Sequence, residues 1–180
     1  VVIYTHVNPD GDAVGSSTAL ALLLGKLGYS VDILIPNGLP DFLKWLPGSD
    51  RITICNQDVA HAKEITSRAG MMFFLDFNDP KRLETLENDV LESNAFKVLI
   101  DHHEDPVDFA DVTISKPGMS SVGEMIHGFI SEMGHAQLMD HDIATSLYVA
   151  IMTDTGNFRH SSSYPEVFRV AGKLMNYDID

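Results

Sequence analysis

Short apolar runs alternate along the chain with longer segments in which apolar residues recur every three or four positions. The short runs predict strands, because strands buried on both faces of a parallel sheet read as nearly continuous apolar stretches. We expect six of them, near residues 1–6, 31–35, 51–54, 71–75, 96–100 and 111–115. Strands that alternate with helices are typical of βαβ units. The pattern therefore predicts an α/β fold with a mostly parallel, twisted sheet flanked by helices.

The intervening segments predict helices. The first runs from Ala13 to Leu27, with its N-cap near Gly11 or Asp12, and Gly28 is suited to the position just after its end. Further helices are expected near residues 40–46, 58–69, 79–92, 119–133, 140–154 and 165–177. The last third of the chain is thus predicted to be helical.

Composition bounds the class of protein. A chain of 180 residues with 44% hydrophobic and 21% charged content suits one globular domain over residues 1–180. It begins without Met inside an apparent strand, so we interpret it as the N-terminal part of a longer protein. No apolar stretch approaches the roughly 18 residues that span a bilayer, and no signal segment opens the chain, which predicts a soluble, cytoplasmic protein without a membrane partner. The single cysteine, Cys55, excludes an intrachain disulfide and a cysteine-based zinc site.

The charge balance narrows the choice of partners. The net charge is −14, from 12 Lys and Arg against 26 Asp and Glu. Proteins that grip long duplex nucleic acid usually present a basic patch, and none is visible here. A small anionic substrate is still compatible with this charge, because bound cations can reverse the sign of a site.

His and Asp side chains follow several predicted strands at the point where each strand ends. His6, Asp10 and Asp12 come after the first strand, and Asp101-His102-His103 comes after the strand near 96–100. In an open α/β sheet, ligands bind in the crevice beyond the carboxyl ends of the strands. Two further aspartates belong to the same inventory, Asp76 and Asp154. Together these side chains predict one shared metal site and an enzyme.

Charge decides which metal fits. Four converging aspartates, Asp10, Asp12, Asp76 and Asp154, carry a formal charge of −4, and like charges a few ångströms apart are unfavourable unless they are neutralised. Two divalent cations cancel this charge. Ligands rich in carboxylate suit Mn²⁺ or Mg²⁺ better than a structural zinc site. We expect two Mn²⁺ ions, with Mg²⁺ or another divalent cation as the alternative.

Simpler interpretations stand beside this one. Alone, Asp10-Gly11-Asp12 is more typical of a turn, and an EF-hand is excluded because Val14 and Ala21 occupy positions that require oxygen ligands. Asp154 alone is equally compatible with the end of a helix. Ser121 and Glu124 have the spacing of a capping box, so Ser120 and Ser121 are better explained as helix caps than as substrate ligands. Surface or packing roles are the interpretation for four other histidines, His61, His127, His135 and His141.

The combination of motifs resembles a known family. His6-Val7-Asn8-Pro9-Asp10-Gly11-Asp12, then Asp76, then Asp101-His102-His103, then Asp154 occur in the order of the four motifs of the DHH phosphoesterase superfamily. The resemblance runs from Val2 to about Tyr164. It is strongest to the bacterial subgroup of oligoribonucleases and phosphoadenosine-phosphate phosphatases, often labelled exopolyphosphatase-related. RecJ exonucleases and family II inorganic pyrophosphatases are more distant relatives.

The resemblance implies a dinuclear Mn²⁺ site. One ion would be held by His6, Asp10 and Asp76, and the other by Asp12, Asp76, His102 and Asp154, with Asp76 as the bridge. Adjacent side chains diverge, so His103 is the candidate for contacting the scissile phosphate or protonating the leaving oxygen. Asp101 is then expected to orient an imidazole.

The expected activity is hydrolysis of short oligoribonucleotides or of 3′-phosphoadenosine 5′-phosphate. Candidate substrate-binding residues are Arg159, Ser120 and Ser121. Members of the subgroup carry a C-terminal DHHA1 domain with a Gly-Gly-Gly-His motif, which does not occur in these 180 residues. The alternatives are an inorganic pyrophosphatase or exopolyphosphatase and, in another class, a non-catalytic nucleotide-binding regulatory module. A homodimer is left open.

Overall fold

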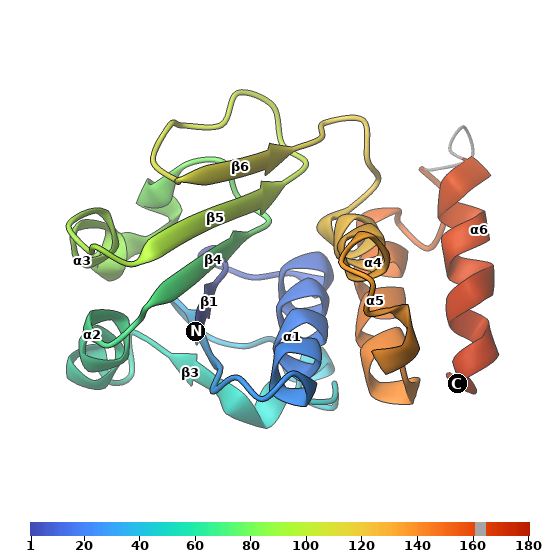
Figure 1. Cartoon of the computed structure of the whole chain (residues 1–180), viewed down its shortest axis with the longest axis horizontal. Helices are drawn as coiled ribbons and strands as arrows, with labels where there is room; N and C mark the ends of the chain where they lie inside the picture. The colour runs from blue at the N-terminus through green and yellow to red at the C-terminus, as the bar shows by residue number, and fades with distance from the viewer. Residues whose placement is uncertain (161–164) are drawn as a thin grey trace.

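Six parallel strands form a single twisted sheet in the computed structural model, which describes residues 1–160 and 165–180 (Figure 1). The strands are β1 Val2–Tyr4, β2 Asp32–Ile35, β3 Ile52–Ile54, β4 Met71–Leu75, β5 Phe96–Asp101 and β6 Val112–Ser115. Each predicted strand is present, so the expected α/β architecture is confirmed. Tyr164, near which the family resemblance ends, lies outside the described residues.

The strand order is β3-β2-β1-β4-β5-β6, with parallel pairing between every pair of neighbours. The chain winds outward from β1 to β3, returns to the centre, and continues on the other side from β4 to β6. The order therefore reverses between β1 and β4. In open sheets of this kind, a crevice for ligands opens beyond the carboxyl ends of the strands at the reversal.

Helices cover both faces of the sheet (Figure 1). The α-helices are α1 Gly11–Lys26, α2 Val59–Ser67, α3 Glu87–Leu91, α4 Val122–Glu132, α5 His141–Asp154 and α6 Pro165–Leu174. Short 3₁₀ segments are η1 Asp41–Leu43, η2 Ser49–Arg51, η3 Pro80–Leu86, η4 Ala136–Leu138 and η5 Met175–Tyr177. Within residues 1–160 and 165–180, the structure contains no helix both long and apolar enough to cross a membrane.

Two predicted helices are shorter or broken. The segment near 40–46 forms only the single turn η1, because Pro40 and Pro47 bound it closely. The segment near 79–92 forms η3 and then α3, with a break inside η3 at Glu84, whose φ of 52° and ψ of −113° are not helical. The Arg82 carbonyl accepts a hydrogen bond from the N–H of Val7, 3.0 Å away. Because this carbonyl bonds to the loop after β1, it does not accept a hydrogen bond within a regular helix.

The alternating side chains of the strands bury apolar residues on both faces. Ile3, Ile33 and Phe73 pack into a core with α1, α4, α5 and α6. On the other face, Tyr4 and Phe74 stack with ring centroids 5.3 Å apart and pack with residues of α2, η3 and α3. The C-terminal helices do not form a separate body, because α4 lies beside the sheet with α1, and α5 and α6 pack outside these two helices in the same core (Figure 1).

Glycine allows α1 and α5 to approach at backbone distance. A Cβ atom placed on Gly15 would lie 2.5 Å from the backbone oxygen of Ser146 and 2.9 Å from the Cβ of Ala150. A Cβ on Gly123 of α4 would lie 2.5 Å from that same Ala150 Cβ. Side chains of ordinary size do not fit at either contact. Helices α1 and α4 can approach α5 this closely because Gly15 and Gly123 have no side chain.

We expect Gly15→Ala to destabilise the protein, because the added methyl group would push α1 away from α5. Overpacking of this kind lowers the free energy of unfolding by about 1–3 kcal/mol, which corresponds to roughly 2–4 °C in Tm per kcal/mol for a domain of this size. Gly25→Ala in the same helix is the control. Its Cβ would have only Arg51 Nη1 nearby, at 3.7 Å, so helix propensity should leave stability unchanged or raised. Equal thermal shifts in the two variants would contradict close α1–α5 packing.

Candidate metal centre

His6 and Asp10 lie in the connection between β1 and α1. The Nε2 atom of His6, a buried side chain, is 3.4 Å from Asp76 Oδ2. Asp10 is the N-cap of α1, since its Oδ1 accepts hydrogen bonds from the N–H groups of Asp12 and Ala13 at 3.0 Å each. The expected cap at Gly11 or Asp12 was therefore wrong, because Asp10 has the extended backbone that an N-cap requires. The cap uses one carboxylate oxygen of Asp10 and leaves the other for a ligand.

Asp12 is fully buried and joins two helices. Its Oδ2 accepts a hydrogen bond from the N–H of Val122 at 2.6 Å, and its Oδ1 accepts one from the N–H of Gly123 at 2.8 Å. Burial raises the pKa of Asp12 well above its ordinary value, and the charges of Asp76 and Asp154 add to this effect. The two backbone N–H groups oppose the shift. An ionised Asp12 is thus favoured by a cation beside it.

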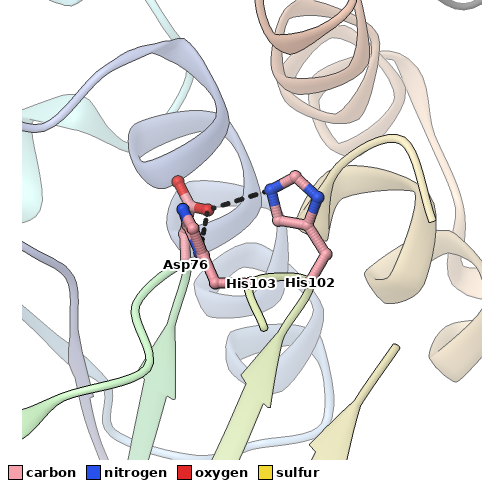
Figure 2. Close-up of side chains that lie close together, drawn as sticks. All are labelled: Asp76, His102 and His103. Carbon is pink, nitrogen blue, oxygen red and sulfur yellow. Dashed lines mark ion pairs between the residues drawn. The ribbon is translucent and has the colours of Figure 1, made fainter. Parts of the chain in front are cut away.

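Asp76 lies at the centre of the cluster, where its carboxylate faces His6 and His102. Figure 2 shows its ion pairs with His102 and His103. It follows β4 with a left-handed φ of 67°, a conformation that Asp tolerates better than most residues. Oδ2 faces His6, whereas Oδ1 lies 3.6 Å from His102 Nε2. Burial raises the pKa of Asp76, but hydrogen bonds from His102 and His6 outweigh it and hold the pKa below its usual range. Its two oxygens therefore point to two different halves of the site.

His102 faces three carboxylates. Its Nε2 is 3.3 Å from Asp154 Oδ2 and 4.0 Å from Asp12 Oδ2, in addition to its contact with Asp76. On the opposite side of the ring, Nδ1 lies 3.2 Å from the carbonyl oxygen of Met119, which can only accept a hydrogen bond. This contact orients the ring so that Nε2 faces the carboxylates. Burial opposes the charged ring, but the hydrogen bond with Asp76 and the charge of Asp154 raise the pKa of His102 to about 9.

His103 turns away from His102, with the two ring planes 60° apart. Its Nδ1 lies 2.7 Å from Asp101 Oδ1 and 4.0 Å from Asp76 Oδ1, and 42% of its side chain is exposed. The hydrogen bond with Asp101 raises the pKa of His103 above its ordinary value. Asp101 itself is fully buried, and its Oδ2 has no hydrogen-bond partner among the described residues. Asp101 thus bonds to the His103 ring and holds it on the solvent-exposed side of the cluster.

Asp154 is the last residue of α5 and lies at the edge of the cluster. Burial raises the pKa of Asp154 to about 6; the charge of His102 lowers it, and those of Asp76 and Asp10 raise it further. The close packing of α5 on α1 brings this carboxylate to the ends of β1 and β4. Asp154 lies at the end of a helix, where an aspartate alone could be an ordinary cap. In the structure it also lies close to the three other aspartates of the cluster.

The ligating atoms form three groups in which all atoms lie within 4.8 Å of one another. These groups are His6, Asp10 and Asp76; Asp12, His102 and Asp154; and Asp76, His102 and His103. The first two divide the six predicted ligands between two neighbouring positions, and Asp76 has an oxygen facing each. The structure therefore brings all six predicted metal ligands together, from segments spread between residues 6 and 154.

The predicted substrate residues lie differently. Ser121 is the N-cap of α4, because its Oγ accepts a hydrogen bond from the N–H of Glu124 at 3.1 Å. Ser120 Oγ donates to Glu124 Oε2 at 2.8 Å. The Ser121 half of the capping box expected from the sequence is present, but Glu124 Oε2 accepts from the N–H and Oγ of Ser120 instead of from the N–H of Ser121. Both hydroxyl groups are therefore engaged. Arg159 is exposed, and the described residues include no hydrogen bond or ion pair between it and the cluster. Substrate binding by these three residues stays a prediction.

Two features beside the cluster were not predicted from the sequence. Arg82 Nη2 lies 2.9 Å from His6 Nδ1. Asn8 and Asn37 join the loops after β1 and β2 through two hydrogen bonds of 2.6 Å, one of them between the two side-chain amides. Only their positions in the sequence could have indicated these residues: Asn37 follows the end of β2 closely, and Arg82 comes six residues after Asp76. Arg82 was hidden within a segment that the pattern predicted as a regular helix.

Comparisons with known proteins agree on the family. The DHH family, N-terminal domain, matches residues 1–151. A bifunctional oligoribonuclease and PAP phosphatase NrnA from Thermus thermophilus is 31% identical over 179 residues, which are 99% of this chain and 50% of that protein. An exopolyphosphatase-related protein from Bacteroides fragilis superposes with a TM-score of 0.97 at 38% identity, over 99% of this chain and 53% of that one.

A putative family II inorganic pyrophosphatase from Methanococcus jannaschii shares the fold, with a TM-score of 0.62 at 20% identity over 98% of this chain and 55% of that one. The chain spans about half the length of the relatives that it matches. The family match covers most of the chain and includes the segments that supply five of the six clustered ligands. By this match, and by its identity to the Thermus protein, the chain belongs to the DHH family.

Proposed function

We propose that this chain is the catalytic domain of a metal-dependent phosphoesterase that hydrolyses short oligoribonucleotides or 3′-phosphoadenosine 5′-phosphate. The observation that carries the proposal is the convergence of six His and Asp side chains into two groups around Asp76. Similarity to the Thermus protein, named as an oligoribonuclease and PAP phosphatase, supports the choice of substrates. Because that relative is about twice as long, the substrate preference is proposed for the whole protein.

The side chains fit two divalent cations. His6, Asp10 and Asp76 would hold one, and Asp12, Asp76, His102 and Asp154 the other. The chemical fit lies in the carboxylates, since the raised pKa values of Asp12 and Asp154 reflect a surplus of buried negative charge. A mixed set of carboxylate and imidazole ligands suits Mn²⁺. When bound, such a pair of cations supplies Lewis acidity, which makes water more acidic and polarises a phosphoryl oxygen.

His103 and Asp101 act on the substrate side of the cluster in this proposal. Asp101 accepts the hydrogen bond from His103 Nδ1 and fixes the ring, so Nε2 is the atom available to a substrate. The raised pKa of His103 favours the protonated ring, which donates a hydrogen. That ring can contact a phosphoryl oxygen or protonate the leaving oxygen. Its exposure, in contrast to buried Asp76, agrees with contact to a substrate rather than to a metal.

A pyrophosphatase or polyphosphatase is the less favoured alternative. A long polyanion is expected to require several grouped cations. Among the described residues, Arg82 is the Lys or Arg side chain whose hydrogen bond reaches a candidate ligand. One such cation suits a substrate with a single reacting phosphate. A non-catalytic nucleotide-binding module is also disfavoured, because it has no need for four clustered aspartates.

Metal binding should depend on pH and release protons. Asp154, with its pKa raised to about 6, and His102, with its pKa raised to about 9, must both lose a proton to ligate a cation. Mn²⁺ affinity should therefore fall steeply below pH 6 and rise as pH increases toward 9. Calorimetry in two buffers of different ionisation enthalpy measures the released protons. An exposed-histidine variant, His61→Ala, should behave like the wild type. Affinity that is constant between pH 6 and 8 would contradict the assigned ligands.

Asp76→Asn should remove the shared ligand while preserving the shape of the side chain. Loss of a group that merely orients a ligand typically weakens metal binding or activity by about 10–100-fold, so loss of a bridging carboxylate should exceed this. We expect Mn²⁺ binding to weaken at both positions and hydrolysis of a diribonucleotide and of 3′-phosphoadenosine 5′-phosphate to be lost. The control is Asp108→Asn, an exposed residue with the same change of charge. Near-normal turnover in Asp76→Asn would exclude a bridging role.

The two adjacent histidines should separate metal binding from chemistry. His103→Ala should slow turnover by roughly 10²–10⁴-fold and still bind two Mn²⁺ per chain, since the cluster retains all six assigned ligands. His102→Ala should lose metal, because its Nε2 faces three carboxylates. Metal stoichiometry and single-turnover rates of both variants decide the matter. Equal metal loss in the two would show that the group of Asp76, His102 and His103 is itself a metal site.

A further inference from the structure

Arg82 places a guanidinium group at the edge of the cluster. Its Nη2 lies 2.9 Å from His6 Nδ1, on the side of the ring opposite to Asp76. All twelve Lys and Arg residues fall within the described part of the chain. For none of the other eleven does the structure include a hydrogen bond or ion pair to any of the six assigned ligands. Among the Lys and Arg residues, Arg82 is thus the one whose side chain contacts an assigned ligand of this aspartate-rich site.

Arg82 has no carboxylate partner within 4 Å among residues 1–160 and 165–180. Its neighbour Lys81 differs, because it is exposed and its Nζ lies 3.8 Å from Asp79 Oδ2. Arg82 is half-buried, so part of its hydration is lost without an ion pair to replace it. A half-buried, unpaired guanidinium at a site edge is suited to an anion supplied by a ligand.

The backbone holds this guanidinium in place. The Arg82 carbonyl accepts a hydrogen bond from the N–H of Val7, and the Arg82 N–H donates to the Asp79 carbonyl, both at 3.0 Å. The first of these bonds ties η3 to the loop that carries His6. The break in the helix at Glu84 follows two residues later. The side chain is therefore fixed at the reversal point of the sheet rather than on a free surface helix.

The hydrogen bonds of His6 show when Arg82 is free to bind a substrate. His6 Nδ1 lies 2.8 Å from the Val7 carbonyl, which needs a ring N–H, and 2.9 Å from Arg82 Nη2, which needs a ring lone pair. Nδ1 cannot satisfy both at once. A cation ligated by His6 Nε2 uses the lone pair of that atom, so the ring hydrogen lies on Nδ1 and bonds to Val7. Arg82 then has no acceptor on the ring.

We propose that Arg82 binds an oxygen of the substrate phosphate at the His6 side of the site. The inference rests on the proposed function, and it names the residue that recognises the anionic group of the substrate. The planar guanidinium can donate two parallel N–H groups to one phosphate. Arg82 also offsets the negative charge that a phosphate meets on approach to a chain of net charge −14. Because Arg82 is released from His6 when His6 ligates a metal, phosphate binding by Arg82 should depend on the metal.

The test uses the intact protein saturated with Mn²⁺ and inorganic phosphate as the probe. Charge-assisted hydrogen bonds of this type contribute about 1.5–3 kcal/mol, so Arg82→Ala should weaken phosphate affinity by roughly 10–100-fold. Arg82→Lys should recover part of that loss, because it keeps the charge but not the fork. Lys81→Ala is the matched control, since it removes a neighbouring positive charge, and it should bind phosphate like the wild type. Titration calorimetry measures phosphate affinity and, separately, the number of Mn²⁺ bound.

Unchanged Mn²⁺ stoichiometry together with weakened phosphate binding in Arg82→Ala alone supports the inference. Loss of Mn²⁺ in Arg82→Ala, or equal losses of phosphate affinity in Arg82→Ala and Lys81→Ala, would overturn it, because Arg82 would then be a brace for His6 or a contributor of general charge. The proposed function fails by a different result. If the wild-type protein hydrolyses no phosphoester but its phosphate affinity depends on Arg82, the activity is wrong and the anion site stands.

Discussion

The carboxylate of Asp12 joins two helices whose contact residues are 110 positions apart. Its oxygens accept the first backbone N–H groups of α4, which helix geometry otherwise leaves without partners. Asp12 lies at the second position of α1, so the start of α1, and with it the loop from His6 to Asp10, is fixed relative to α4. Gly15 at the α1–α5 contact then allows α5 to bring Asp154 close to the start of α1. The buried carboxylate of Asp12 and the close α1–α5 contact thus determine how the loop from His6 to Asp10 meets Asp154.

The same arrangement concentrates negative charge. Burial raises the pKa values of Asp12 and Asp154, whereas two imidazoles hold that of Asp76 low. The difference has a geometric cause: His6 and His102 each face one oxygen of Asp76, whereas the hydrogen bonds to Asp12 come from the backbone N–H groups of Val122 and Gly123. A site built this way is electrostatically incomplete without cations. The need for neutralisation therefore comes from packing, because the fold brings these carboxylates together and buries Asp12 and Asp76 completely or almost completely.

Topology explains why the ligands come from segments so distant in the sequence. Loops after β1 and β4 are neighbours only because the strand order reverses between them. The loop after β5 lies beside the loop after β4, which places His102 and His103 on the far side of Asp76 from His6. The Arg82 carbonyl in η3 bonds to the N–H of Val7, two residues before the break at Glu84. An irregular segment thereby brings a guanidinium group to an acidic site.

The sequence by itself determined the strands, the parallel sheet and the six residues that converge, because apolar runs and the ligands after them are local patterns and strand ends share one edge. It did not determine the short η1 or the division of η3 from α3, since these depend on contacts across the fold. Only the tertiary structure decided which oxygen of Asp76 faces which imidazole and that Arg82 reaches His6. Each depends on the relative position of distant segments, which no local pattern encodes.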